Sequence, residues 1–370
     1  MRHRKGYIFA PLVLAGLLQN LPPAAGQTKK VVPARRTVRK AKPAPPVDPT
    51  VGDNVDGDDL TVRRAAVAAL GGMNGSVVVV DPSDGRILTI VNQKLALASG
   101  FIPCSTIKLV TSLAALSEHV VERETPVRIG RYLTFDLDNA IARSNNEYFG
   151  VLGQRLGYDR VMHYARMLGL GERAGLDIPG EEPGSVPDGP PKAGGMVLMT
   201  AYGEGFLVTP LELAALLSAI ANGGTLYYLQ YPRSETDGSG FTPQVKRTLE
   251  LAPNGIPDLR VGMREAVDFG TARSAAYDPN EPILGKTGTC TDFRFYSHMG
   301  WFGSFNEVSA HQLVVVVMLM GTHAVSGGVA ASVAGAIYRN LSGQRYFAAN
   351  TPSGPPMPLI ITTRPCCGGR

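Results

Sequence analysis

The chain has 370 residues, a hydrophobic content of 44% and a formal net charge of +5. Its length and apolar content are sufficient to bury a sizeable core. The positive charge is concentrated in residues 1–50, which hold ten Lys and Arg and one acidic residue and leave the remaining residues at −4. This distribution excludes a basic nucleic-acid-binding body, so we expect no nucleic acid as a partner.

The amino-terminal residues have the layout of a secretory signal peptide. A basic start at residues 2–5 precedes an apolar run at 8–18 and a small-residue stretch at 24–26. The run is shorter than the roughly 20 apolar residues that span a bilayer, although a retained membrane anchor is the alternative. We therefore expect residues 1–26 to direct export to the periplasm or another extracytoplasmic space.

Two further segments are expected to lack a fixed fold. Residues 27–59 combine Lys and Arg with prolines and few large apolar groups, which favours an extended, disordered linker. Such a linker either lies along anionic envelope polymers or lipid headgroups, or is a solvated spacer. Residues 346–370 are rich in Pro and Gly and are expected to form a flexible tail, in which we assign no function to Cys366 and Cys367.

Between these segments, residues 60–345 are expected to form one catalytic domain. The patterns indicate a helix at 61–70, strands at 76–81 and 86–92, mainly helices and loops over 105–263, strands at 283–290, 298–305 and 311–320, and a helix at 325–340. Strands at both ends of a helical middle predict a five-stranded antiparallel sheet with an all-α lobe inserted between its second and third strands. The fold class is α/β of the α+β type, with the catalytic groups between the two lobes.

Three short motifs occur in a fixed order along this domain. They are Ser105-Thr106-Ile107-Lys108, Ser144-Asn145-Asn146 and Lys286-Thr287-Gly288. Each alone is typical of a helix cap or a turn. Together they are the S-x-x-K, S-x-N and K-T-G set of the serine acyltransferases that react with penicillin.

The first two motifs contain the groups that a serine nucleophile needs. Ser105 lies at the start of a helix-like run, 107–116, where the helix dipole favours developing negative charge. Lys108 is one turn further on and can receive the serine proton. Ser144 would relay protons between Lys108 and the leaving amine, while Asn146 would orient Lys108 and hold a substrate amide.

The third motif is expected to bind the substrate. The ammonium of Lys286 and the hydroxyls of Thr287 and Thr289 suit a substrate carboxylate, and Gly288 would let the substrate approach the strand. The backbone N–H groups of Ser105 and Thr289 would form the oxyanion hole.

The chain resembles the transpeptidase domain of penicillin-binding proteins over about residues 75–340. Beyond the three motifs, the resemblance rests on residues 75–88, 169–181, 203–224, 270–272 and 301–302. It implies a β-lactamase/transpeptidase-like fold and a D,D-transpeptidase or D,D-carboxypeptidase that acts on D-Ala-D-Ala peptide stems of peptidoglycan through a Ser105 acyl-enzyme. It also implies β-lactam antibiotics as covalent inhibitors and allows cell-envelope proteins as partners.

A serine β-lactamase is the first alternative, because it shares the nucleophile and differs in releasing the acyl group to water. Class A β-lactamases use a Glu in an E-x-x-L-N loop, which is absent between Asn146 and Met196. Class D enzymes usually have a hydrophobic residue where this chain has Asn146, and a Tyr-Gly-Asn element where this chain continues Tyr202-Gly203 with Glu204. Slow deacylation is therefore favoured.

A non-catalytic penicillin-binding sensor or scaffold is the second alternative. Wall-building transpeptidases of high molecular weight usually have a large pedestal domain before the catalytic domain, whereas residues 1–59 are mostly signal and linker. Glu204 also replaces a Gln that is usual in the family. The complete set of motifs argues against a dead enzyme.

The resemblance implies a disulfide between Cys104 and Cys290. Cys104 directly precedes the nucleophile, Cys290 follows Gly288 by two residues, and the matching positions are bridged in certain class A β-lactamases. An exported protein is in the right redox compartment, although two buried thiols are the alternative. The bridge would hold the Ser105 and Thr289 amides at a fixed separation.

No metal or cofactor is expected, because a serine with a lysine base is a complete nucleophile. The strand-associated histidines, His298, His311 and His323, lack a metal-ligand spacing and favour structural or surface roles. Trp301 is the only tryptophan and is expected to pack beneath the catalytic groups.

Overall fold

The structure is a computed structural model that describes residues 48–232, 241–307 and 311–348. The expected signal peptide, most of the expected linker and the two tail cysteines lie outside the described residues. No helix among the residues that the structure describes is long and apolar enough to cross a membrane.

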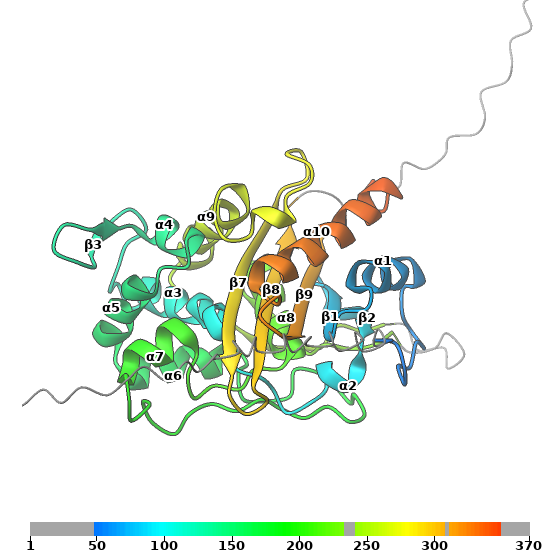
Figure 1. Ribbon diagram of the computed structural model, residues 1–370, viewed down its shortest axis with the longest axis horizontal. Coiled ribbons are helices and arrows are strands. Elements are labelled where there is room, and N and C mark those ends of the chain that lie inside the picture. Colours follow the sequence, from blue (N-terminus) through cyan, green and yellow to red (C-terminus); the bar gives the residue numbers. More distant parts are fainter. Residues whose placement is uncertain (1–47, 233–240, 308–310, 349–370) are drawn as a thin grey trace, which may run out of the picture. The chain divides into compact units, whose positions relative to one another are not determined.

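A five-stranded antiparallel sheet forms the centre of the described fold (Figure 1). Its strands are β1 (Gly75–Asp81), β2 (Arg86–Val91), β7 (Ile283–Asp292), β8 (Ser297–Asn306) and β9 (Val314–Gly321). The order across the sheet is β2-β1-β9-β8-β7, so the two amino-terminal strands lie beside the last strand of the chain. The predicted sheet and its division between the two ends of the domain are confirmed.

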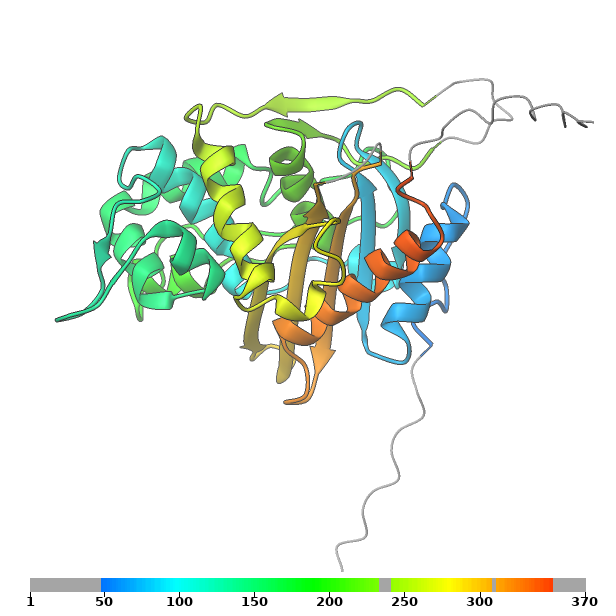
Figure 2. The same cartoon turned by 90° about the horizontal axis from the view of Figure 1, so that it is seen from above.

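Helices cover both faces of this sheet. Val77 and Val79 of β1 pack in one apolar cluster with α1 (Leu60–Leu70) and α10 (Gly327–Gly343), whereas Val78 and Val80 pack in another with α8 (Pro210–Ala221). Figure 2 shows α1 and α10, in blue and orange, on one side of the sheet and the green α8 on the other. Because alternate residues of a strand point to opposite faces, a continuous valine run suits a strand that is buried on both faces.

The segment inserted between β2 and β7 is mainly helical. Besides α8 it contains α2 (Gln93–Ala96), α3 (Lys108–Ser117), α4 (Leu137–Ala142), α5 (Asn146–Leu156), α6 (Tyr158–Met167), α7 (Gly195–Tyr202) and α9 (Gly255–Asp268), with 3₁₀ turns η1 (Cys104–Ile107) and η3 (Arg273–Ala275). It also contains two short antiparallel pairs, β3 (Val127–Arg128) with β4 (Thr134–Phe135) and β5 (Thr225–Tyr227) with β6 (Val245–Thr248). The lobe is therefore not entirely α-helical, contrary to our expectation. These strands were missed because two to four residues give too short a pattern to recognise in the sequence.

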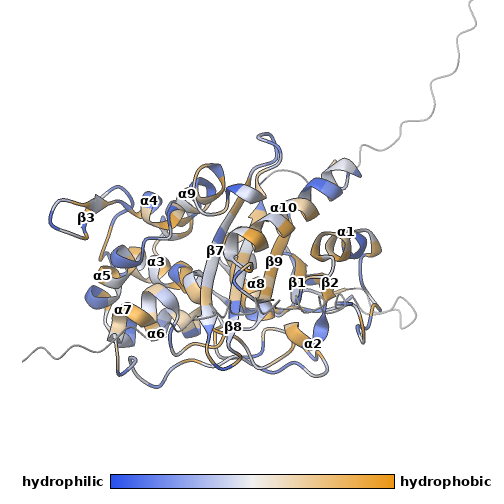
Figure 3. Ribbon diagram, in the orientation of Figure 1, coloured by the Kyte–Doolittle hydropathy of each residue, from blue (hydrophilic) through white to orange (hydrophobic). Residues whose placement is uncertain are grey.

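The edge strand β7 differs in composition from the central strands. Figure 3 shows β9 coloured apolar along its length and β7 pale to polar. β7 contains the third motif and pairs only with β8. Its other edge is therefore unpaired and faces the helical insertion. An edge strand that is not apolar can present polar groups to a site without disrupting the core.

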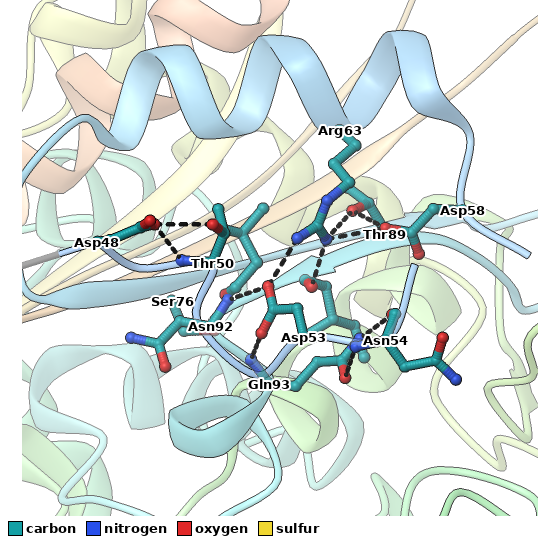
Figure 4. A network of polar contacts seen from close by, with 12 residues as sticks. Asp48, Thr50, Asp53, Asn54, Asp58, Arg63, Ser76, Thr89, Asn92 and Gln93 are labelled. Atoms are coloured by element: carbon teal, nitrogen blue, oxygen red, sulfur yellow. Dashed lines mark hydrogen bonds and ion pairs between the residues drawn. The ribbon is translucent and has the colours of Figure 1, made fainter. Parts of the chain in front are cut away.

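Part of the expected linker is joined to the folded body. Arg63 of α1 forms ion pairs with Asp53 at 2.8 Å and with Asp58 at 2.9 Å (Figure 4). Asp53 also accepts hydrogen bonds from the backbone N–H groups of Asn92 and Gln93. The expected boundary at residue 60 therefore differs from the structure, because acidic residues that look like loop residues in the sequence pair with a buried arginine.

The carboxyl-terminal boundary differs in a similar way. The expected tail begins at residue 346, yet the Tyr346 hydroxyl donates to Asp59 at 2.9 Å and Phe347 is buried beside Tyr338. These two aromatic residues belong to the folded body.

Candidate active site

The nucleophile motif begins in a strained turn. Ser105 lies in η1, which runs directly into α3, and the residue before it, Cys104, has a left-handed backbone with φ of 51°. This region favours glycine and costs a non-glycine residue roughly 1–2 kcal/mol. Strain of this kind persists only where surrounding contacts impose it, and it is frequent at functional sites.

Lys108 has a fully buried side chain in the first turn of α3. Its Nζ lies 3.1 Å from Ser105 Oγ, 2.7 Å from the Ser144 carbonyl oxygen and 2.6 Å from Asn146 Oδ1. Burial, with a smaller contribution from the charge of Lys286, lowers the pKa of Lys108 to about 6. The amine is therefore largely unprotonated at neutral pH and can act as a base.

Ser144 connects the first motif to the third. It lies between α4 and α5 with φ of 54°, and Asn145 caps α5 by accepting from the Tyr148 N–H at 2.7 Å. Ser144 Oγ is 3.1 Å from Lys108 Nζ and 2.8 Å from Lys286 Nζ. One hydroxyl thus lies between two lysines, which suits it to pass a proton.

Lys286 is the second fully buried lysine of the site. Its Nζ donates to Ser144 Oγ and, at 2.9 Å, to the carbonyl oxygen of Thr287. Burial lowers the pKa of Lys286 to about 7. Among the residues that the structure describes, no carboxylate forms an ion pair with either Lys108 or Lys286.

Thr287 and Thr289 of β7 already have hydrogen-bond partners. Thr287 is buried, and its hydroxyl lies 2.6 Å from the hydroxyl of Thr271. Thr289 is exposed and accepts from the Gly327 N–H at the start of α10 at 2.8 Å. A hydroxyl has one proton and two lone pairs, so Thr289 still has its proton for a substrate oxygen.

Gly288 has a packing role that the sequence did not indicate. A Cβ at this position would lie 3.0 Å from the Pro103 carbonyl oxygen and 3.2 Å from Cys104 Cβ. The space that we expected to admit substrate is occupied by the segment before the nucleophile. Glycine at 288 therefore lets that segment pack closely on β7.

The predicted disulfide is present. Cys104 and Cys290 are bonded, with their Cα atoms 5.5 Å apart across a sequence separation of 186 residues. The bond joins η1 to β7 beside the Gly288 contact. Ser105 and Thr289, which flank these cysteines in sequence, are thereby kept on neighbouring elements.

Trp301 packs beneath this segment as expected. It is fully buried in β8, and its Nε1 donates to the Ile102 carbonyl oxygen at 3.0 Å. Of the histidines, His298 and His323 lie ring to ring at 4.1 Å. In the described ranges no three His, Cys, Asp or Glu residues form a group that could hold a metal ion.

Three further contacts were not found from the sequence. Ser105 Oγ lies 3.5 Å from the Ala201 carbonyl oxygen, Asn146 Nδ2 donates to the Tyr202 hydroxyl at 2.9 Å, and Thr271 contacts Thr287 as described above. The resemblance covers residues 203–224 and 270–272, which include Thr271 but neither Ala201 nor Tyr202, and it assigned none of these contacts. No short-range spacing could have revealed them, because Tyr202 is 56 residues from Asn146.

This arrangement of a serine and two buried lysines between a five-stranded sheet and a helical insertion defines the class of penicillin-interacting serine acyltransferases. The family model described as "Penicillin binding protein transpeptidase domain" matches residues 75–339, and the chain belongs to this family.

The chain is also similar in sequence to curated proteins. The chain is 30% identical over 296 residues to "Stage V sporulation protein D" of Bacillus subtilis (strain 168), which covers 70% of this chain and 45% of that protein. It is 25% identical over 303 residues to "Peptidoglycan D,D-transpeptidase MrdA" of Acinetobacter baumannii, which covers 65% of this chain and 45% of that protein. The chain thus spans about half the length of these two relatives.

Solved structures share the fold. Pseudomonas aeruginosa PBP2, in complex with WCK 5153, superposes with a TM-score of 0.66 at 26% identity, covering 77% of this chain and 74% of that one. The TP domain of Burkholderia pseudomallei penicillin-binding protein 3 gives a TM-score of 0.65 at 22% identity, covering 79% of this chain and 95% of that one.

Proposed function

We propose that this protein is a penicillin-binding D,D-transpeptidase or D,D-carboxypeptidase that acts on D-Ala-D-Ala peptide stems of peptidoglycan through a Ser105 acyl-enzyme. The observation that carries the proposal is the unbroken series of contacts from Ser105 through Lys108 and Ser144 to Lys286. The family and the relative named as a peptidoglycan D,D-transpeptidase support it.

Acylation begins at Lys108. Its unprotonated amine removes the hydroxyl proton of Ser105, and Ser105 Oγ attacks the carbonyl carbon of the penultimate D-Ala. The negative charge that develops on the carbonyl oxygen is stabilised by the N–H groups of Ser105 and Thr289. The disulfide and the Gly288 contact support this role, because they hold the two residues on adjoining elements.

The tetrahedral intermediate then collapses with loss of the terminal D-Ala. The C–N bond breaks, Ser144 gives its hydroxyl proton to the leaving nitrogen, and Lys108 returns to Ser144 the proton taken from Ser105. Lys286 binds the substrate carboxylate with Thr289 and orients Ser144. Attack by an amine of a neighbouring stem, or by water, later cleaves the ester and restores the Ser105 hydroxyl.

The glutamates that follow the second motif support slow release to water. Glu172 pairs with Lys246 and Arg247. Glu181 is buried and accepts the N–H groups of Ala174 and Gly175. Both carboxylates are therefore engaged in structural contacts, which argues against either of them as the base that would activate water in a β-lactamase.

Mass spectrometry tests the proposed function directly. The purified protein is incubated with a penicillin, and its intact mass is followed over time beside Ser105→Ala. We expect a persistent adduct of one penicillin that Ser105→Ala lacks, followed by D-Ala release from a pentapeptide stem in the untreated enzyme. Rapid turnover to penicilloate would identify a β-lactamase, an adduct without D-Ala release would identify a sensor, and no adduct would refute serine acylation.

Export remains a prediction from residues 1–26, which lie outside the described residues. The disulfide supports an extracytoplasmic location, because such bonds persist in oxidising compartments. The corresponding test is to isolate the protein from the periplasm and to compare its intact mass with and without reductant, which shows whether the disulfide is present.

A further inference from the structure

Both polar atoms of the Asn146 side-chain amide form hydrogen bonds. Its Oδ1 accepts from Lys108 Nζ at 2.6 Å, and its Nδ2 donates to the hydroxyl of Tyr202 at 2.9 Å. Tyr202 belongs to none of the three motifs. It is 37% exposed, so part of its side chain is open to solvent.

The amide oxygen has a specific effect on Lys108. A neutral amine has two N–H bonds and one lone pair. The carbonyl oxygens of Ser144 and of the Asn146 side chain can only accept, and both lie closer to Nζ than Ser105 Oγ does. They therefore take the two N–H bonds and leave the lone pair for the Ser105 proton.

A rotated amide would have the opposite effect. Turning Asn146 by half a revolution about its terminal bond exchanges Oδ1 for Nδ2, which carries two protons. The amide nitrogen would then donate to the lone pair of Lys108 and compete with Ser105. The orientation of one amide thus decides whether Lys108 is available as a base.

The packing of α7 places Tyr202 against this amide. Thr200 Oγ1 donates to the Phe149 carbonyl oxygen of α5 at 3.0 Å. The two helices approach closely at Gly153, where an added Cβ would lie 2.1 Å from Thr200 Oγ1. Gly203, with φ of 76°, ends α7 immediately after Tyr202. The hydroxyl is therefore positioned by the helix pair that carries Asn146.

We propose that Tyr202 is a positioning residue of the active site, whose hydroxyl holds the Asn146 amide so that Lys108 keeps its lone pair directed at Ser105. This inference rests on the proposed acyl-enzyme function and adds a residue to it. Tyr202 acts through Asn146 and takes no part in the proton transfers.

The test variant is Tyr202→Phe, which removes the hydroxyl and keeps the ring. We expect the second-order rate constant for acylation by a penicillin to fall about 3- to 10-fold at neutral pH, the size of one neutral hydrogen bond. Loss of the fixed amide oxygen also disfavours the protonated form of Lys108, which lowers its pKa further. The acid limb of the acylation profile should therefore move to lower pH, a change that a general loss of structure would not produce.

Two controls isolate the contact. Tyr148→Phe removes a buried hydroxyl that has no hydrogen-bond partner among the described residues, only two residues from Asn146, and should leave acylation unchanged. In a double-mutant cycle with Asn146→Ala, Tyr202→Phe should have no further effect, because the amide through which it acts is gone.

The outcomes separate the two proposals. No adduct on the native protein would overturn the proposed function and the role of Tyr202 with it. A native rate and pH profile in Tyr202→Phe, or an equal loss with and without Asn146, would overturn the role of Tyr202 alone.

Discussion

Two regions of this molecule bury basic side chains, one beside carboxylates and one beside uncharged polar groups. Arg63 is enclosed with two carboxylates, those of Asp53 and Asp58 (Figure 4), whereas Lys108 and Lys286 are surrounded by hydroxyl, amide and carbonyl oxygens. Burial acts to lower the pKa of Arg63, but its bonds to the two aspartates outweigh this and raise it. Among the described residues no carboxylate forms an ion pair with either lysine, and burial lowers their pKa values to about 6 and 7, although the charge of Glu147 opposes this at Lys108.

The difference shows that one chain uses the free-energy cost of burying a charged side chain for two purposes. A paired cation attaches residues 53–59 to the sheet and stays charged. A lysine that lies deeper and has no ion-pair partner among the described residues loses its proton near neutral pH and can then act as a base. The comparison predicts that removing the paired arginine should destabilise the fold, whereas removing the neutral amine of Lys108 should abolish acylation.

The largest effect is expected for Lys108→Arg, which keeps the positive charge and removes the base. Arginine does not deprotonate in proteins, so it cannot accept the Ser105 proton. We expect the acylation rate constant to fall by about 10²- to 10⁴-fold, the usual contribution of a general base. In the native protein the rate constant should rise with pH through about 6, as Lys108 loses its proton, and this limb should vanish in the variant.

The measurement is stopped-flow acylation by a chromogenic cephalosporin between pH 5 and 9, with the fold checked by circular dichroism. Lys246→Arg is the matched control. Lys246 pairs with Glu172 outside the site, so this variant should be acylated at the native rate. A folded Lys108→Arg protein that acylates at the native rate would show that another group is the base.

A loss of stability is expected when the paired arginine is removed. Arg63→Ala leaves Asp53 and Asp58 buried without their counter-ion, and breaking a buried pair in this way costs about 3–5 kcal/mol. Urea unfolding should show this loss, while the folded fraction still forms the penicillin adduct. Arg64→Ala, on the exposed side of the same helix turn, should change the free energy of unfolding by less than about 0.5 kcal/mol. Equal stability of the two variants would mean that the ion pairs contribute nothing.

Much of the fold could be predicted from the sequence because its signals are local. The valine runs of β1 and β9 and the helical periodicity after Ser105 depend on neighbouring residues. The motif order and the resemblance then indicated that Ser105, Lys108 and Lys286 would meet, and the structure brings them together. The cysteine pairing also came from the resemblance.

The contacts that were missed depend on tertiary approach. Asp53 and Asp58 looked like linker residues because their arginine partner was expected in a different segment. Tyr202 reaches Asn146 only because α7 packs on α5 at Gly153. At Gly288 the sequence led us to expect substrate approach, and only the position of Pro103 reveals the close packing.

The smallest expected effect is a gain in stability from Lys108→Met. An unfolded lysine has a pKa of about 10.4, whereas buried Lys108 has one of about 6. Between these values the unfolded chain binds more protons at this site, so native stability rises with pH across this window and the burial penalty is largest below it. Methionine removes the penalty, and we expect a gain of about 1–3 kcal/mol at pH 6 that disappears toward pH 10. Lys246→Met is the control from the paired class: burial lowers the pKa of Lys246, but its ion pair with Glu172 opposes this, so the gain should be smaller than for Lys108→Met. Urea unfolding at pH 6, 8 and 10 compares the two, and a Lys108→Met protein that is less stable than native at pH 6 would mean that the hydrogen bonds of Lys108 outweigh the penalty of burying it unpaired.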